Sequence, residues 1–113
     1  ALTETFLGNL GSVKVDGCNS NSSTMNDAYP RFGDFLNATG RPMLYSCSWP
    51  DYLNDHVNFS YVGEKCNLWR MYRDIYSQWP IIEQIIEWYG DNSAMVQPVA
   101  GPGRWNDACV SAN

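Results

Sequence analysis

The chain has 113 residues, of which 44% are hydrophobic and 14% aromatic, and its formal net charge is −5. This length and composition are typical of one globular domain with its own core and argue against a disordered chain. The negative charge and the lack of a basic stripe argue against a nucleic-acid partner, and no apolar run approaches the length of a membrane span.

Short apolar runs alternate with longer amphipathic ones, which is typical of βα units around a parallel sheet. Ser12–Val15 is predicted as the first strand. A helix should follow from Thr24 to about Leu36, because apolar residues recur there at helical spacing. The predicted apolar stripe consists of Met25, Ala28, Phe32, Phe35 and Leu36.

The second half of the chain repeats this alternation. Met43–Ser46 and Lys65–Leu68 are predicted as the second and third strands, and Val96–Val99 as the fourth. Pro80 suits the first turn of a helix that ends near Tyr89. The buried face of that helix would hold Ile81, Ile82, Ile85, Ile86 and Tyr89. No change in composition marks a linker, so we interpret residues 1–113 as one α/β unit without a second domain.

Two aspartates follow strand-like runs. Asp16 comes directly after Ser12–Val15 and before a glycine, and Asp74 follows the aromatic stretch beyond Lys65–Leu68. Two carboxylates that meet in one site are what a glycosidase needs. An Asp-Gly pair is also an ordinary turn signal, so the spacing alone leaves a structural turn as the alternative.

Three Asn-X-Ser/Thr sequons, at Asn21, Asn37 and Asn58, lie in polar, loop-like stretches and are predicted glycosylation sites. Together with four cysteines they indicate the secretory pathway, and we expect a lysosomal or secreted protein. Residues 1–4 show neither a basic nor an apolar leader, which favours a mature or internal stretch. No Cys-X-X-Cys pair or pair of histidines is present, so neither a metal nor a cofactor is expected.

Four blocks of the sequence resemble glycoside hydrolase family twenty-seven, which contains the α-galactosidases and α-N-acetylgalactosaminidases. They are VKVDGCNS, LNATGRPMLYSCSWPDY, CNLWRMYRDI and QPVAGPGRWND. The blocks follow the family's order and approximate spacing from about Thr5 to Asp107. The resemblance implies a partial (β/α)8 TIM barrel whose strands correspond roughly to the fourth to seventh, since a complete barrel needs about 250 residues.

The resemblance also implies a function. Members of the family it resembles are retaining exo-glycosidases, which remove terminal α-linked galactose or N-acetylgalactosamine from glycoconjugates, and the same activity is implied for this chain. Asp16 would be the nucleophile and Asp74 the general acid and base. Lys14 shares a strand face with Asp16 and would keep it ionised while bonding a sugar hydroxyl. The alternative is an inactive truncated product that at most binds sugar.

Four further residues match the family's sugar site. Ser48 and Tyr52 match the loop that reads the substituent at carbon 2 of the sugar. Ser48 leaves room for an acetamido group, whereas Asp51 would fill or polarise that room, so the preference between the two sugars stays open. Arg70 matches a residue that contacts sugar hydroxyls, and it would also suit an ion pair with a nearby carboxylate.

The cysteines are also interpreted through the resemblance. Cys47 and Cys66 match a family disulfide, with two buried thiols as the alternative. Cys18 matches a cysteine whose partner lies upstream, and we expect no bond between Cys18 and Cys109. For partners, the resemblance implies an α-galactoside or α-N-acetylgalactosaminide substrate and allows a homodimer. Asp107 is left open between a structural and a sugar-proximal role.

Overall fold

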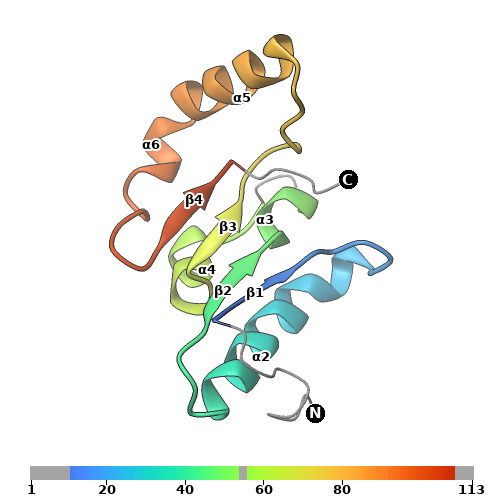
Figure 1. Ribbon diagram of the computed structural model, residues 1–113, viewed down its shortest axis with the longest axis vertical. Coiled ribbons are helices and arrows are strands. Elements are labelled where there is room, and N and C mark those ends of the chain that lie inside the picture. The colour runs from blue at the N-terminus through green and yellow to red at the C-terminus, as the bar shows by residue number, and fades with distance from the viewer. Residues whose placement is uncertain (1–10, 54–55, 109–113) are drawn as a thin grey trace.

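The structure is a computed structural model that describes residues 11–53 and 56–108. Its centre is a sheet of four strands in the order β1-β2-β3-β4, with every neighbouring pair parallel (Figure 1). The strands are β1 Ser12–Val15, β2 Leu44–Cys47, β3 Leu68–Arg70 and β4 Trp105–Asp107. Because all strands run in one direction, their carboxyl ends meet at one edge of the sheet, where sites of α/β proteins form.

Helices make every connection between these strands, which confirms the predicted α/β alternation. The connections contain η1 Ser22–Thr24 and α2 Met25–Ala38, then α3 Trp49–Tyr52 and α4 Phe59–Lys65, then α5 Trp79–Asp91 and α6 Ser93–Val96. β1 has the predicted bounds, β2 begins one residue late, and α5 extends the predicted helix at both ends. The short helices α3 and α4 were not predicted from the sequence.

The buried face of α2 differs from the predicted stripe. Of that stripe Met25 and Leu36 are buried as predicted, whereas Ala28 and Phe35 are exposed. Tyr29 and Gly33, which were not part of the stripe, are buried as well. Glycine is needed at position 33 because a Cβ there would lie 3.0 Å from the carbonyl oxygen of Lys65. The helix therefore turns its smallest residue toward α4, and the large apolar residues predicted to face the core do not all do so.

The third strand begins three residues later than predicted. Asn58 caps α4, since its Oδ1 accepts a hydrogen bond from the backbone N–H of Tyr61 at 3.2 Å. The helix continues to Lys65, and the N–H of Cys66 donates to Val62 at 2.8 Å. Lys65 is thus helical, and Leu68–Arg70 forms β3. A helix of seven residues is too short to stand out in the hydrophobic pattern.

The predicted fourth strand, Val96–Val99, is wrong. Val96 ends α6, and Pro98, which has no N–H to give to a ladder, lies in the following turn. The strand is Trp105–Asp107, aligned by the N–H of Trp105 donating to the carbonyl of Asn67 at 2.9 Å. Asn106 is held from both sides: it accepts from Trp69 Nε1 at 2.8 Å and donates to the carbonyl of Val96 at 3.2 Å.

The core lies between the sheet and the helices that cover it. Its largest fully buried side chains include Trp49, Trp69, Met71 and Val62. On α5 only Ile85 is fully buried, whereas Ile86 is 60% exposed, so its predicted burial is wrong. Among the described helices, none has the length and apolar character that a membrane crossing requires.

Candidate active site

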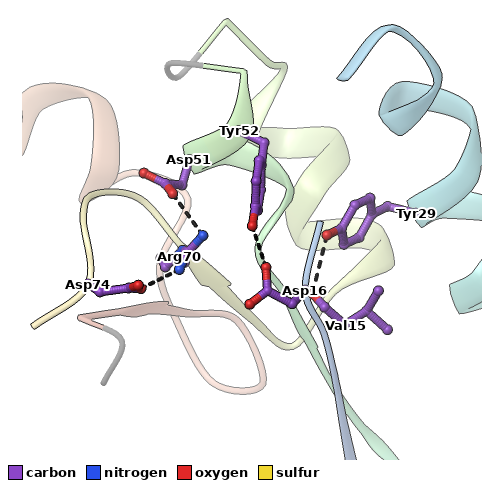
Figure 2. A network of polar contacts seen from close by, with 7 residues as sticks. All are labelled: Val15, Asp16, Tyr29, Asp51, Tyr52, Arg70 and Asp74. Carbon is purple, nitrogen blue, oxygen red and sulfur yellow. Dashed lines mark hydrogen bonds and ion pairs between the residues drawn. The ribbon is translucent and has the colours of Figure 1, made fainter. Parts of the chain in front are cut away.

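Asp16 follows the last residue of β1 and lies at the carboxyl edge of the sheet, as expected for a residue after a strand. Its Oδ1 accepts a hydrogen bond from the Tyr52 hydroxyl at 2.5 Å, and Figure 2 shows the ring of Tyr52 standing over it. The strand end is fixed from the other side, where the Tyr29 hydroxyl donates to the carbonyl of Val15 at 3.2 Å. Asp16 is therefore held in place by elements on two sides.

The residue after Asp16, the candidate nucleophile, is Gly17, and there is little room for a side chain at this position. A Cβ at this position would lie 2.6 Å from Met25 Cε and 2.7 Å from the ring of Tyr52. Such distances are below what real Cβ atoms show, so any side chain would push Tyr52 away from Asp16. The Asp-Gly pair that suggested a simple turn is thus required by the close approach of Tyr52.

Arg70 is the centre of the charged part of the site. It ends β3, and its side chain is only 7% exposed. Its Nη2 lies 2.8 Å from Asp51 Oδ2, and its Nη1 forms an ion pair with Asp74 Oδ1. Figure 2 shows the guanidinium between the two carboxylates. The guanidinium also lies over the ring of Tyr52, 5.3 Å from its centre, so it touches the residue that holds Asp16.

The protonation states follow from these contacts. The Tyr52 hydrogen bond, followed by backbone N–H groups of Gly17 and Cys18 and the charge of Arg70, holds the pKa of Asp16 below its usual value despite desolvation. Burial raises the pKa of Asp51, with Arg70 opposing that effect. Burial would lower the pKa of Arg70, but Asp51 and Asp74 together raise it. Tyr52, rather than the predicted Lys14, makes the largest contribution at Asp16.

Ser48 and Lys14 lie at the same edge of the sheet. Ser48 follows β2, is fully buried, and joins β1 through its N–H, which donates to the carbonyl of Val15 at 3.2 Å. Its Oγ has no hydrogen-bond partner among the described residues. Lys14 is an exposed residue of β1, in register with Ser46 of β2.

The disulfide between Cys47 and Cys66 is present, with a Cα–Cα distance of 6.2 Å. It joins the end of β2 to the residue after α4, so it braces the segment that carries Asp51 and Tyr52. Cys18 is free and exposed. Cys109 lies outside the described residues, so the expected absence of a bond between Cys18 and Cys109 stays a prediction.

The predicted glycosylation sites are all exposed. Asn21 Oδ1 accepts from the backbone N–H of Ser23 at 3.0 Å, and Asn58 caps α4 in the same manner. Asn37 lies near the end of α2. Each remains a predicted site of attachment at a position that leaves room for a glycan.

Other predicted features are brought together less completely. A cavity of about 190 Å³ between β1 and α2 has Asp16 in its wall, but Asp74 does not line it. Asp107 ends β4 beside Arg70 in register, and His56 is an exposed loop residue. In the described part of the chain no three acidic, His or Cys side chains are grouped so that they could hold a metal ion.

Sequence reasoning missed two contacts of this site. It treated Asp51 as a residue that shapes the sugar pocket, whereas its carboxylate is engaged by Arg70. It also did not foresee the bond between Tyr52 and Asp16. The available signal was topological: Asp16, the Asp51–Tyr52 pair and Arg70 each follow or end a neighbouring parallel strand, and such ends converge.

Comparison with known proteins places this geometry in a family. The family model described as alpha galactosidase A matches residues 4–111. The chain belongs to this family of glycoside hydrolases. It is 47% identical over 98 residues to alpha-N-acetylgalactosaminidase of Gallus gallus, which covers 84% of this chain and 24% of that protein. It is 46% identical to the Homo sapiens alpha-N-acetylgalactosaminidase and 39% identical to the Homo sapiens alpha-galactosidase A, again over 84% of this chain.

The chain spans about a quarter of the length of these relatives. The aligned part makes up 24%, 24% and 23% of the three proteins, in the order given. The four parallel strands therefore correspond to one part of those relatives' sequences. Similarity is higher to the alpha-N-acetylgalactosaminidases than to the alpha-galactosidase A of the same species.

Proposed function

We propose that this chain supplies the catalytic centre of a retaining exo-glycosidase, which removes terminal α-linked galactose or N-acetylgalactosamine from glycoconjugates. Its four strands would be strands four to seven of a (β/α)8 barrel, with the site at the carboxyl edge. The observation that carries the proposal is Asp16: a strand-end carboxylate held ionised by Tyr52 and by backbone N–H groups. An ionised, oriented carboxylate is what attack on an anomeric carbon requires.

In the proposed mechanism the two carboxylates act in turn. Asp74 protonates the glycosidic oxygen while the Asp16 carboxylate attacks the anomeric carbon, so the bond to the leaving group breaks and a glycosyl ester forms. Asp74, now ionised, takes a proton from water, which attacks the ester and releases the sugar with its configuration retained. Arg70 and Lys14 would donate to sugar hydroxyls.

The sugar's 2-substituent would be read at Ser48. Ser48 is fully buried, so it would act through its small size, by leaving space for an acetamido group. Because Ser48 is small, the pocket would accept N-acetylgalactosamine, and the stronger similarity to alpha-N-acetylgalactosaminidases favours that sugar. The alternative of a chain that binds sugar without turnover stays in place until activity is measured.

The test uses a complete barrel, hereafter the barrel chimera: the Gallus gallus enzyme with the segment that aligns with this chain, over 98 residues, replaced by the corresponding residues of this chain. We expect hydrolysis of aryl α-N-acetylgalactosaminides, abolished by Asp16→Asn. Asp74→Asn should reduce activity on alkyl glycosides more than on aryl ones, because good leaving groups need less help from an acid. Equal loss on both substrates would exclude the acid role, and activity that survives Asp16→Asn would exclude the nucleophile.

A further inference from the structure

The predicted glycosylation site at Asn58 lies in the wall of a cavity. The cavity has a volume of about 610 Å³ and shares no lining residue with the smaller cavity beside Asp16. Three helices contribute to its wall, since Asn26 lies on α2, Trp49 on α3 and Tyr61 on α4. A sugar attached to Asn58 would therefore begin at the junction of these three helices.

The side chain of Asn58 has two polar atoms with different tasks. Its Oδ1 accepts a hydrogen bond from the backbone N–H of Tyr61 at 3.2 Å and so caps α4. Nδ2 is the atom to which a glycan is attached, and attachment there leaves the capping bond in place. Because the amide group is planar, the capping bond also fixes the direction of Nδ2. The first sugar of a glycan would thus start from a defined position.

The lining of this cavity suits a sugar. Trp49, Val57 and Tyr61 provide its apolar and aromatic surface. Asn26 and His56 add polar side chains. The ring of Tyr61 is 38% exposed, although it packs edge-on against the buried Trp49 with 6.0 Å between ring centres. The indole N–H of Trp49 already donates to Asn26 Oδ1 at 2.9 Å. A pyranose ring carries C–H groups on its faces and hydroxyls at its edge, so it matches an aromatic surface with polar neighbours.

We propose that Asn58 carries a glycan whose first N-acetylglucosamine packs on the exposed ring of Tyr61 in this cavity and fastens α4 to α2 and α3. N-linked glycans of the secretory pathway begin with this sugar. The role is structural and does not rest on the proposed function. It still bears on the candidate active site, because α3 carries Asp51 and Tyr52.

The test uses the 113-residue chain, secreted from eukaryotic cells and trimmed enzymatically to one N-acetylglucosamine at each occupied site. Ser60→Ala destroys the sequon of Asn58 without changing the residue that caps α4. We expect this loss of the sugar to lower the urea midpoint by roughly half a molar more in the parent chain than in Tyr61→Ala, which is about one aromatic contact divided by a typical m-value. The effect of Ser60→Ala on helix propensity is common to both backgrounds and cancels.

Two controls separate the sugar from the substitutions. The same four chains made in a host without N-glycosylation should show no such difference, because any direct coupling between positions 60 and 61 would persist there. Ser23→Ala removes the sequon of Asn21, which does not line this cavity. Its effect on the midpoint should be the same with and without the Tyr61 ring.

A second measurement needs no variant. In the trimmed parent chain, NMR should show NOEs between the ring protons of Tyr61 and the protons of the sugar on Asn58. Three results would each overturn the proposal: an Asn58 peptide without sugar in mass spectrometry, equal losses of stability with and without the Tyr61 ring, or a sugar on Asn58 that shows no NOE to that ring.

Discussion

The disulfide allows a quantitative prediction about stability. Cys47 and Cys66 are 1% and 2% exposed and are separated by 19 positions in the sequence. Closing a loop of that size removes about 11 cal/mol/K of entropy from the unfolded chain, which corresponds to about 3 kcal/mol at room temperature. The double variant Cys47→Ala/Cys66→Ala should therefore lose about 3 kcal/mol of unfolding free energy.

Urea unfolding followed by tryptophan fluorescence measures this loss, because Trp49 and Trp69 are fully buried beside the bridge-bearing strands. With an m-value of about 2 kcal/mol/M, the midpoint should fall by about 1.5 M. Cys18→Ser is the matched control, since Cys18 is exposed and free, and its midpoint should stay where it is. Equal midpoints for the double variant and the parent chain would refute the reasoning.

Two further predictions concern the site in the barrel chimera. Gly17→Ala should lower kcat/KM by about tenfold or more, because the new methyl displaces the ring of Tyr52, 2.7 Å away, from Asp16. Gly90→Ala is the control, since its new methyl meets nothing within 4 Å, and it should have no such effect. Equal behaviour of the two variants would contradict the role of Tyr52. Tyr52→Phe should move the acidic limb of the kcat/KM profile to higher pH, since the hydrogen bond that lowers the pKa of Asp16 is lost and the nucleophile protonates sooner as the pH falls; an unmoved limb, as expected for the exposed Tyr76→Phe control, would show that Tyr52 does not tune Asp16.

The parts of the fold that sequence could predict are those with a strong local pattern. β1 alternates valines with polar residues before Asp-Gly, and α5 has a proline in its first turn and isoleucines at helical spacing. β4 has no such pattern: Trp-Asn-Asp becomes a strand because Trp69 and the carbonyl of Val96 hold Asn106 from both sides. That arrangement depends on tertiary contacts, which overrule the stronger β propensity of Val96–Val99.

The site divides in the same manner. Asp16 and Asp74 were singled out by motif and position, since each follows a predicted strand, and their pairing in one site stays a prediction. An ion pair of Arg70 with a nearby carboxylate was one of the interpretations of the sequence, and it is confirmed. That Asp51 is one of its partners could not be predicted, because this depends on how the segment after β2 packs against the end of β3. An aspartate in a four-residue helix such as α3 carries no local sign of its partner. The sequence indicates which residues are candidates for the site, but only the structure shows that Asp51 and Asp74 share the guanidinium of Arg70.

The most direct test of the proposed covalent role of Asp16 is trapping of the glycosyl-enzyme. The barrel chimera would be treated with an activated 2-deoxy-2-fluoro α-galactoside or a reactive galactose-configured cyclitol, digested, and mapped by mass spectrometry. We expect one sugar adduct on the peptide that contains Asp16, absent from Asp16→Asn. An adduct on Asp51 or Asp74, or turnover with no adduct on the Asp16 peptide, would contradict the assignment of the nucleophile.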